Sequence, residues 1–414
     1  MPSVDFTPLA GLRGAQWDPA RLPADMIASV HTLTTVDGAN VTGYLYRRGD
    51  EKAVCCLMHP REILATHYLV PELLEAGAAV WVQGSRNPGN DLRLEHELAL
   101  LDVDAGTTFL KERGFDQLVL VGNSGGGGLY AYYTEQANLP PAQRETRTPA
   151  GRPVKLAEAS MARPDLLVLV APHPGQGMLL MNSLDPSVTD ERDPLSLDPT
   201  LFPFATRNGF SRDGANYSPE FIDRYRAAQR ARVARIDGIA RELVSRRMEA
   251  RRRVKAGEAS DQERLMAGWQ HIFEVPRTDA DLRNWDLSLD PTDRTLGSLW
   301  GRDPFKTNMN GVGFGKVCTP ESWLSTWSGL SSKAGMLRCA PVIDQPTLVV
   351  RYTADACVFP GEIAAIFDAL GTPDKNQVSI RGTHHGQPLA AGEPSGQTLA
   401  GEAIRGWLNG RLVI

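Results

Sequence analysis

The chain has little that would tie it to a membrane, to nucleic acid or to an oxidising compartment. No apolar run approaches the roughly 18 residues of a membrane helix. The first 17 residues lack a basic start followed by an apolar stretch, so we expect no signal peptide. The net charge of −5 gives no general attraction to nucleic acid or to anionic lipid. The five cysteines contain no Cys-x-x-Cys pair, which favours reduced thiols and a cytoplasmic location: Cys55, Cys56, Cys318, Cys339 and Cys357.

Metal and nucleotide sites are missing from the pattern as well. Four histidines (His31, His67, His96 and His271) are scattered without the close spacing of metal ligands. The glycine-rich stretch over 122–128 has no Gly-Lys-Ser/Thr ending, and no G-x-G-x-x-G precedes an acidic residue on a following strand. We therefore expect neither a metal nor a cofactor.

The sequence does contain a regular alternation of buried strands and helices. The segments at 30–36 and 40–47 flank Asp-Gly-Ala and predict a hairpin. Apolar runs then end near residues 58, 85, 124 and 172, with helical segments between them, and the same rhythm returns after residue 344. Buried strands separated by helices predict an α/β fold with a mostly parallel sheet covered on both faces.

The alternation stops between residues 175 and 340. This segment is polar, rich in Pro, Asp and Arg, and has no strand-like run. A long helix is predicted to begin at Ser218 and Pro219, which suit the N-cap and the first helical position. The helix is strongly basic, but no nucleic-acid motif or interleaved aromatics accompany it, so we interpret it as a solvated face and expect no nucleic-acid partner.

The stretch Gly122-Asn123-Ser124-Gly125-Gly126 lies between a predicted strand and a predicted helix. An abrupt strand-to-helix turn needs small neighbours, because their side chains would collide, and it exposes the central hydroxyl beside a helix N-terminus. In that context the serine is a candidate nucleophile. A serine hydroxyl needs a histidine to take its proton and a carboxylate to orient that histidine.

Candidates for both partners follow later strands. Asp355 comes just after the strand predicted at 346–353, and His384 and His385 follow the last predicted strand. Only one histidine can be the base. The spacing from Gly382 favours His385, with His384 as the alternative.

Taken together, the serine turn, the acid loop and the histidine loop resemble those of the α/β-hydrolase superfamily, in particular its cytoplasmic esterases with a large cap. The resemblance covers 30–174 and 341–414. It implies a core domain of residues 1–174 and 341–414, with a mainly helical cap, 175–340, inserted between core strands 6 and 7. It also implies an oxyanion hole built from the N–H groups of Gly125 and Arg61. Three positions depart from common family patterns: Asn123 beside the serine, the Tyr-Thr-Ala-Asp acid loop, and His59-Pro60-Arg61 after the first parallel strand.

The substrate pocket is less defined by the sequence. His173 follows a strand at the same edge of the sheet and is a candidate pocket residue. The Arg61 side chain is either an exposed loop residue or a contact for a substrate carboxylate. Aromatic residues late in the insertion either pack the cap or line an apolar pocket: Trp300, Phe305, Phe314, Trp323 and Trp327.

The resemblance implies a serine hydrolase that cleaves a small carboxylic ester through an acyl-enzyme. The aromatic residues lead us to expect a moderately hydrophobic substrate. Two alternatives keep the same three residues: hydrolysis of a carbon–carbon bond, and acyl transfer to an alcohol. An alternative of another class is a non-catalytic binding protein with this fold. A homo-oligomer is left open.

Overall fold

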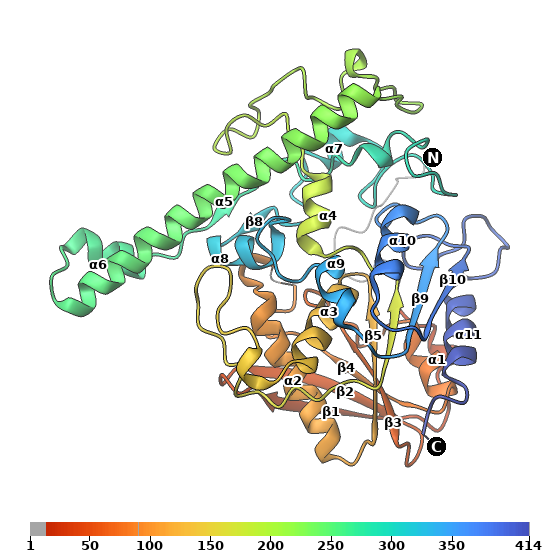
Figure 1. Ribbon diagram of the computed structural model, residues 1–414. Coiled ribbons are helices and arrows are strands. Elements are labelled where there is room, and N and C mark those ends of the chain that lie inside the picture. The colour runs from red at the N-terminus through yellow and green to blue at the C-terminus, as the bar shows by residue number, and fades with distance from the viewer. Residues whose placement is uncertain (1–13, 90, 414) are drawn as a thin grey trace.

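A mostly parallel sheet lies at the centre of the computed structural model, which describes residues 14–89 and 91–413 (Figure 1). Within these residues its eight strands are β1 (Ile27–Thr34), β2 (Asn40–Arg47), β3 (Ala53–Met58), β4 (Ala79–Gln83), β5 (Gln117–Asn123), β6 (Leu166–Val170), β9 (Thr347–Tyr352) and β10 (Lys375–Ile380). They are arranged in the order β1-β2-β4-β3-β5-β6-β9-β10. Strand β2 is antiparallel to both of its neighbours, and the other pairs are parallel. The predicted hairpin and the predicted parallel sheet are confirmed.

Helices cover both faces of this sheet (Figure 1). Alternate residues of β3 show why: Val54, Cys56 and Met58 belong to one apolar cluster, and Ala53, Cys55 and Leu57 belong to the other. A strand with apolar side chains on both faces is stable only between two layers. The flanking helices are α1 (Leu69–Glu75), α2 (His96–Glu112), α3 (Gly125–Asn138), α9 (Met336–Cys339), α10 (Pro360–Ala369) and α11 (Gly396–Leu408).

The chain between β6 and β9 contains several helices joined by long irregular segments. Its elements are α4 (Gln176–Ser183), α5 (Pro219–Ala256), α6 (Asp261–Gly268), α7 (Pro304–Thr307), α8 (Pro320–Ser322), the two-residue strands β7 (Phe273–Glu274) and β8 (Val317–Cys318), and a π-helical turn at Trp323–Trp327. The short β7–β8 pair was not expected from the sequence. We refer to residues 175–340 as the insertion. That it forms a separate domain stays a prediction.

Helix α5 begins where the sequence predicts. Ser218 accepts a hydrogen bond from the Phe221 N–H, Pro219 occupies the first turn, and Gly257 ends the helix with φ of +74°. Its buried residues lie mostly before Ala240, and its second half extends away from the sheet with α6 at the far end (Figure 1). Most basic residues of this half are exposed, whereas Arg247 pairs with Glu321 and Arg253 pairs with Glu263.

Other expectations concern the thiols and the membrane. All five cysteines are buried, and none forms a disulfide with another. In the described ranges, no helix combines the length and apolarity that crossing a bilayer requires. The expectation about a signal peptide falls mainly on residues 1–13, which lie outside the described residues. The cytoplasmic location stays a prediction.

The insertion is joined to the core at the start of α2. The His96 N–H donates to Ser325 Oγ at 2.9 Å, and the Ser325 hydroxyl donates to Glu97 Oε2 at 2.5 Å. The Thr326 hydroxyl donates to the Leu94 carbonyl at 2.8 Å. Burial raises the pKa of Glu97 to about 7, because the charged carboxylate loses its hydration there.

The raised pKa of Glu97 predicts that stability depends on pH. Because its pKa in the folded state lies above the ordinary 4.5, its contribution to the free energy of unfolding is present below pH 4.5 and is lost as the pH rises through 7. Glu97→Gln keeps an acceptor for Ser325 and carries no charge. We expect the variant to match the parent at pH 4.5 and to exceed its unfolding free energy at pH 8 by about 3 kcal/mol. Urea unfolding at both pH values measures this, and the exposed Glu158→Gln is the control. An equal gain at both pH values would contradict the assignment.

Candidate active site

Ser124 occupies a strained turn between β5 and α3. It is not glycine, yet its φ is +52°, with ψ of −119°. Such backbone geometry persists only where the surrounding structure enforces it, and it is typical of a nucleophile held on a sharp strand-to-helix turn.

The glycines around Ser124 are required by close approach. A Cβ on Gly122 would lie 2.7 Å from the Cα of Gly127, and a Cβ on Gly126 would lie 2.6 Å from the Met58 carbonyl oxygen. A Cβ on Gly127 would lie 2.9 Å from Pro172 Cβ. Helix α3 can therefore begin directly at the ends of three neighbouring strands only because these positions have no side chain.

A chain of two hydrogen bonds joins Ser124 to a histidine and an aspartate. The distance from Ser124 Oγ to His384 Nε2 is 2.9 Å, and that from His384 Nδ1 to Asp355 Oδ2 is 2.7 Å. The other oxygen of Asp355, Oδ1, accepts from the N–H groups of Cys357 and Val358 at 2.7 and 2.9 Å. These backbone donors fix the carboxylate so that Oδ2 faces the ring. His384 and Asp355 are 3% and 2% exposed, so both partners of the second bond are buried.

The preference for His385 is corrected: the structure joins the alternative, His384, to Ser124 and Asp355. The Ala354 N–H donates to the Gly382 carbonyl at 2.9 Å, which holds the histidine loop beside the acid loop. Two positions after Gly382, His384 faces Asp355, whereas the next residue, His385, points in another direction. The His385 ring lies 4.6 Å from that of His384, and it lines the cavity in front of Ser124.

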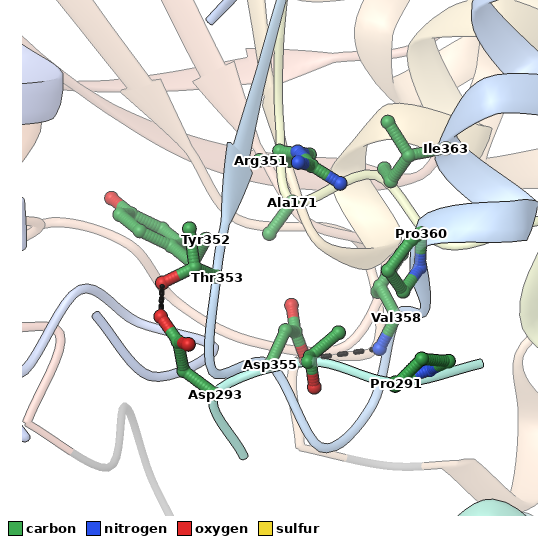
Figure 2. Close-up of a pocket in the computed structure, with 11 residues that line it drawn as sticks. Ala171, Pro291, Asp293, Arg351, Tyr352, Thr353, Asp355, Val358, Pro360 and Ile363 are labelled. Atoms are coloured by element: carbon green, nitrogen blue, oxygen red, sulfur yellow. Dashed lines mark hydrogen bonds between the residues drawn. The ribbon is translucent and has the colours of Figure 1, made fainter. Parts of the chain in front are cut away.

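Asp290 and Asp293, the other acids near this edge, do not reach the histidine. Asp290 accepts from the Gly361 N–H, and Asp293 accepts from the Thr353 hydroxyl at 2.6 Å. Figure 2 shows Asp293 turned toward Thr353, and Asp355 bonded to the backbone of Val358, around a cavity of about 220 Å³ beside the acid loop.

A smaller cavity, about 80 Å³, opens onto Ser124. The core supplies one part of its wall and the insertion the other. Its lining residues are Ala15, His59, Arg61, Glu62, Leu64, Asn123, Ser124, His173, Gln176, Leu299, Trp300, Phe314, His384 and His385.

Two of the five aromatic residues considered for a substrate pocket lie there, and a third, Phe305, packs against Phe202 and Phe204 instead. Trp300 and Phe314 line the cavity, whereas Trp323 and Trp327 are fully buried in the insertion. Trp323 donates its indole N–H to Asp237 Oδ1 at 2.7 Å, so it packs the insertion, and its assignment to the pocket is corrected. Trp327 does not line the cavity either, so its assignment to the pocket is also corrected. Its ring and that of Phe314 lie 5.2 and 5.3 Å from the Arg61 guanidinium.

The backbone N–H of Arg61 is directed into its own loop. It donates to His59 Nδ1 at 3.1 Å, and the Glu62 N–H donates to the same atom at 3.1 Å. The expectation that this N–H serves as the second oxyanion donor is therefore not supported. Gly125 is the first residue of α3, whose N–H has no acceptor within the helix.

His173 lies in a loop of similar design after β6. Its Nδ1 accepts from the Gly175 N–H at 3.1 Å. Burial, with smaller contributions from nearby cationic groups, lowers the pKa of His173 to about 3 and that of His59 well below its ordinary value. Both rings are thus neutral at ordinary pH.

Sequence reasoning missed Gln176 and gave His59 no role of its own. Both residues sit in polar stretches that directly follow a core strand, as does His173. His59-Pro60 follows β3 and His173-Pro174 follows β6, the two strands that flank β5 in the sheet. This repeated His-Pro pair was the available signal.

The arrangement can carry out a nucleophilic addition. A hydroxyl on a strained turn is bonded to an imidazole, the imidazole is bonded to a buried carboxylate, and a helix N-terminus lies beside them. These are the parts that acyl transfer by a serine needs.

Comparisons with known proteins give distant structural likenesses. No family model and no curated protein matches the chain. A hypothetical protein, PA2218 from Pseudomonas aeruginosa, is 12% identical with a TM-score of 0.49, over 94% of this chain and 95% of that one. An esterase domain from a Rhodothermus marinus protein is 11% identical with a TM-score of 0.43, over 92% and 98%. A monoacylglycerol lipase from Paleococcus ferrophilus is 14% identical with a TM-score of 0.41, over 92% and 98%. Likeness at this level transfers no activity to the present chain.

We therefore assign the fold from the arrangement of strands and helices in this chain. The sheet is mostly parallel and covered on both faces, and Ser124 lies on a sharp turn between β5 and α3. The acid and the histidine follow later strands, in the chain order Ser, Asp, His. With these features, the chain has the fold of the α/β-hydrolase superfamily.

Proposed function

We propose that the protein is a serine hydrolase that cleaves a carboxylic ester through an acyl-enzyme, with Ser124 as nucleophile, His384 as general base and Asp355 as the acid. The observation that carries this proposal is the continuous hydrogen-bonded chain from Ser124 through His384 to Asp355 at a cavity. A fold of this kind occurs in proteins with many activities, so we infer the function from the site residues and not from the fold.

The proposed reaction begins with attack of Ser124 Oγ on the ester carbonyl carbon. The new C–O bond forms as the hydroxyl proton passes to His384 Nε2 and the carbonyl π electrons move to oxygen. When the carbonyl re-forms, the C–O bond to the alcohol breaks, and His384 returns its proton to the leaving alkoxide. Water then repeats these steps on the acyl-enzyme and releases the acid. Asp355 keeps the Nδ1 proton in place and stabilises the imidazolium formed in each half-reaction.

The cavity favours a compact substrate group next to the reacting carbon. Its volume of about 80 Å³ is well below that of pockets that enclose a whole drug-sized ligand. Leu299, Trp300 and Phe314 give it an apolar side. A short or flat acyl group fits this description, and the remainder of the substrate would lie outside the cavity.

Activated esters of increasing acyl length, tested beside a dienoic ring-cleavage product and an acceptor alcohol, decide between the possible reactions. Ester cleavage that falls with acyl length supports the proposal. Turnover of the ketone alone, or of esters only with the alcohol present, would replace ester hydrolysis by one of the alternatives. Absence of turnover together with tight ligand binding would favour a binding protein.

The first prediction at this site concerns the nucleophile. A fluorophosphonate should label Ser124 at one equivalent per chain, because its hydroxyl is bonded to a base. Ser124→Ala should lower kcat by several orders of magnitude with unchanged thermal stability. Mass spectrometry of the labelled peptide and ester turnover measure both. Retained turnover in the alanine variant would contradict the mechanism.

A second prediction separates the adjacent histidines. His384→Ala should match the serine variant in its loss of kcat, since residues that act as a unit give similar losses singly. His385→Ala removes a cavity wall and should change activity by about tenfold or less, mainly through KM. Steady-state kinetics on one ester compare the two. The reverse order of severity would return the base assignment to His385.

A third prediction concerns the acid. In Asp355→Asn the amide oxygen can still accept from Cys357 and Val358, while its NH₂ group faces His384 Nδ1. The ring must then carry its proton on Nε2, where it cannot accept from Ser124. We expect kcat to fall by about 10³–10⁴ with stability retained. A loss below tenfold, with a large loss in Asp293→Asn instead, would contradict the assignment.

A further inference from the structure

Two histidines flank the candidate nucleophile in matching loops. Strands β3 and β6 are the neighbours of β5, and each ends in a His-Pro pair, His59-Pro60 and His173-Pro174. In both loops the histidine Nδ1 accepts the backbone N–H two residues further on. The two imidazoles therefore lie on either side of the turn that carries Ser124.

The hydrogen bonds to Nδ1 fix the tautomer of each ring. A backbone N–H can only donate, so the Nδ1 that receives it must be unprotonated. A neutral imidazole with a bare Nδ1 carries its proton on Nε2. Their lowered pKa values keep both rings neutral. Each histidine consequently presents a fixed Nε2–H donor without a positive charge.

These donors converge at the start of α3. A Cβ built on Gly125 would lie 2.6 Å from His59 Nε2, 3.2 Å from His173 Nε2 and 2.6 Å from the amide nitrogen of Gln176. The Cα–Cβ direction in a helix tilts toward its N-terminus, the end from which the first N–H groups emerge. Both imidazole Nε2 atoms therefore lie beside the first residue of α3, whose N–H is the expected oxyanion donor.

A buried polar side chain points to a ligand in this space. Gln176 is 2% exposed and lines the cavity, and its carbonyl oxygen has no hydrogen-bond partner. Buried polar atoms are normally satisfied, so this unpaired acceptor indicates a hydrogen-bond donor that arrives with the substrate; the oxygen of Gln176 is not itself a donor to the oxyanion.

We propose that the Nε2–H groups of His59 and His173 complete the oxyanion hole with the Gly125 N–H, in the place expected for the Arg61 N–H. This inference rests on the proposed function. When Ser124 Oγ adds to the carbonyl, the π electron pair moves to the carbonyl oxygen, and the donors bind the resulting oxyanion. No proton leaves either histidine, and the bonds weaken again when the carbonyl re-forms. Donors held in place before the reaction need no reorganisation as the charge develops.

The two nitrogens of His59 can be tested separately by side-chain length. In His59→Asn the amide oxygen lies near the position of Nδ1 and can accept from Arg61 and Glu62, but nothing reaches the position of Nε2. In His59→Gln the longer side chain places its NH₂ group near Nε2. We expect His59→Asn to lower kcat by about 10²-fold with little change in KM, and His59→Gln to recover at least a tenth of the parent kcat.

Binding of a boronic acid distinguishes an oxyanion donor from a residue that only supports the loop, because a purely structural role of His59 would not change the affinity for the boronic acid. Its adduct with Ser124 is tetrahedral and carries an oxygen at the oxyanion position. The affinity of a short alkylboronic acid should fall in His59→Asn by the same factor as kcat/KM, while that of the product carboxylic acid stays within threefold. His31→Asn, on β1 at the edge of the sheet, is the control and should match the parent in both measurements.

The possible outcomes separate this inference from the proposed function. If the parent neither cleaves esters nor reacts with a fluorophosphonate at Ser124, the proposed function fails. If the parent is active and His59→Asn and His173→Asn each keep kcat within threefold, the hole is built without the histidines and this inference alone fails. Equal losses in His59→Asn and His59→Gln, with boronate affinity unchanged, would also overturn it, because the loop acceptor would then be the essential atom.

Discussion

The close approach of α3 to the strand ends beneath it is the constraint on which the site depends. Gly126 lies against the carbonyl of Met58 at the end of β3, and Gly127 lies against Pro172 after β6. Any side chain at either position would push the helix away from one of these strands. The helix would then no longer begin at Ser124, and the positive φ of that residue would relax. The position of the hydroxyl at the cavity, the helix N-terminus beside it and the approach of both histidine loops therefore follow from one packing requirement.

The direction of the hydrogen bonds around the site is set by groups that can only donate, such as backbone N–H, or only accept, such as a carboxylate. Backbone N–H groups donate to Nδ1 of His59 and His173, so each ring presents a donor at Nε2. At His384 the partner of Nδ1 is a carboxylate that accepts, so Nε2 is left to accept from Ser124. Burial keeps His59 and His173 neutral, so they do not add positive charge next to the base. Three of the four histidines that line the cavity thus have two opposite hydrogen-bonding roles at Nε2, because different groups contact Nδ1 of each ring.

Much of this arrangement was accessible from the sequence, because local rules determine it. Buried strands, the Ser218 cap and the small residues around Ser124 each follow from short-range chemistry. Which of the two adjacent histidines faces the acid could not be predicted from the sequence. His384 and His385 differ only in which side of the loop they face, and that depends on the bond between Ala354 and Gly382, residues brought together by two separate strands. The Arg61 N–H was assigned from a family pattern, but its acceptor, the ring two residues earlier, depends on how the chain turns at Pro60. Trp300 and Trp323 belong to the same stretch of aromatics, and only packing separates the cavity wall from the interior of the insertion.

The reacting groups and the apolar wall of the cavity come from different parts of the chain. Ser124, Asp355, His384 and His59 follow core strands, and the position of each is fixed by backbone hydrogen bonds or by the strand that precedes it. Leu299, Trp300 and Phe314 belong to the insertion, which reaches the core through side-chain hydrogen bonds such as those of Ser325 and Thr326 at α2. The paired strands of the sheet are harder to displace than the insertion, which is attached by side-chain contacts. Breaking those contacts leaves the sheet intact. Under the proposed function, substitutions in the insertion wall would therefore alter which acyl group fits, while the hydrogen-bonded chain from Ser124 to Asp355 keeps its geometry.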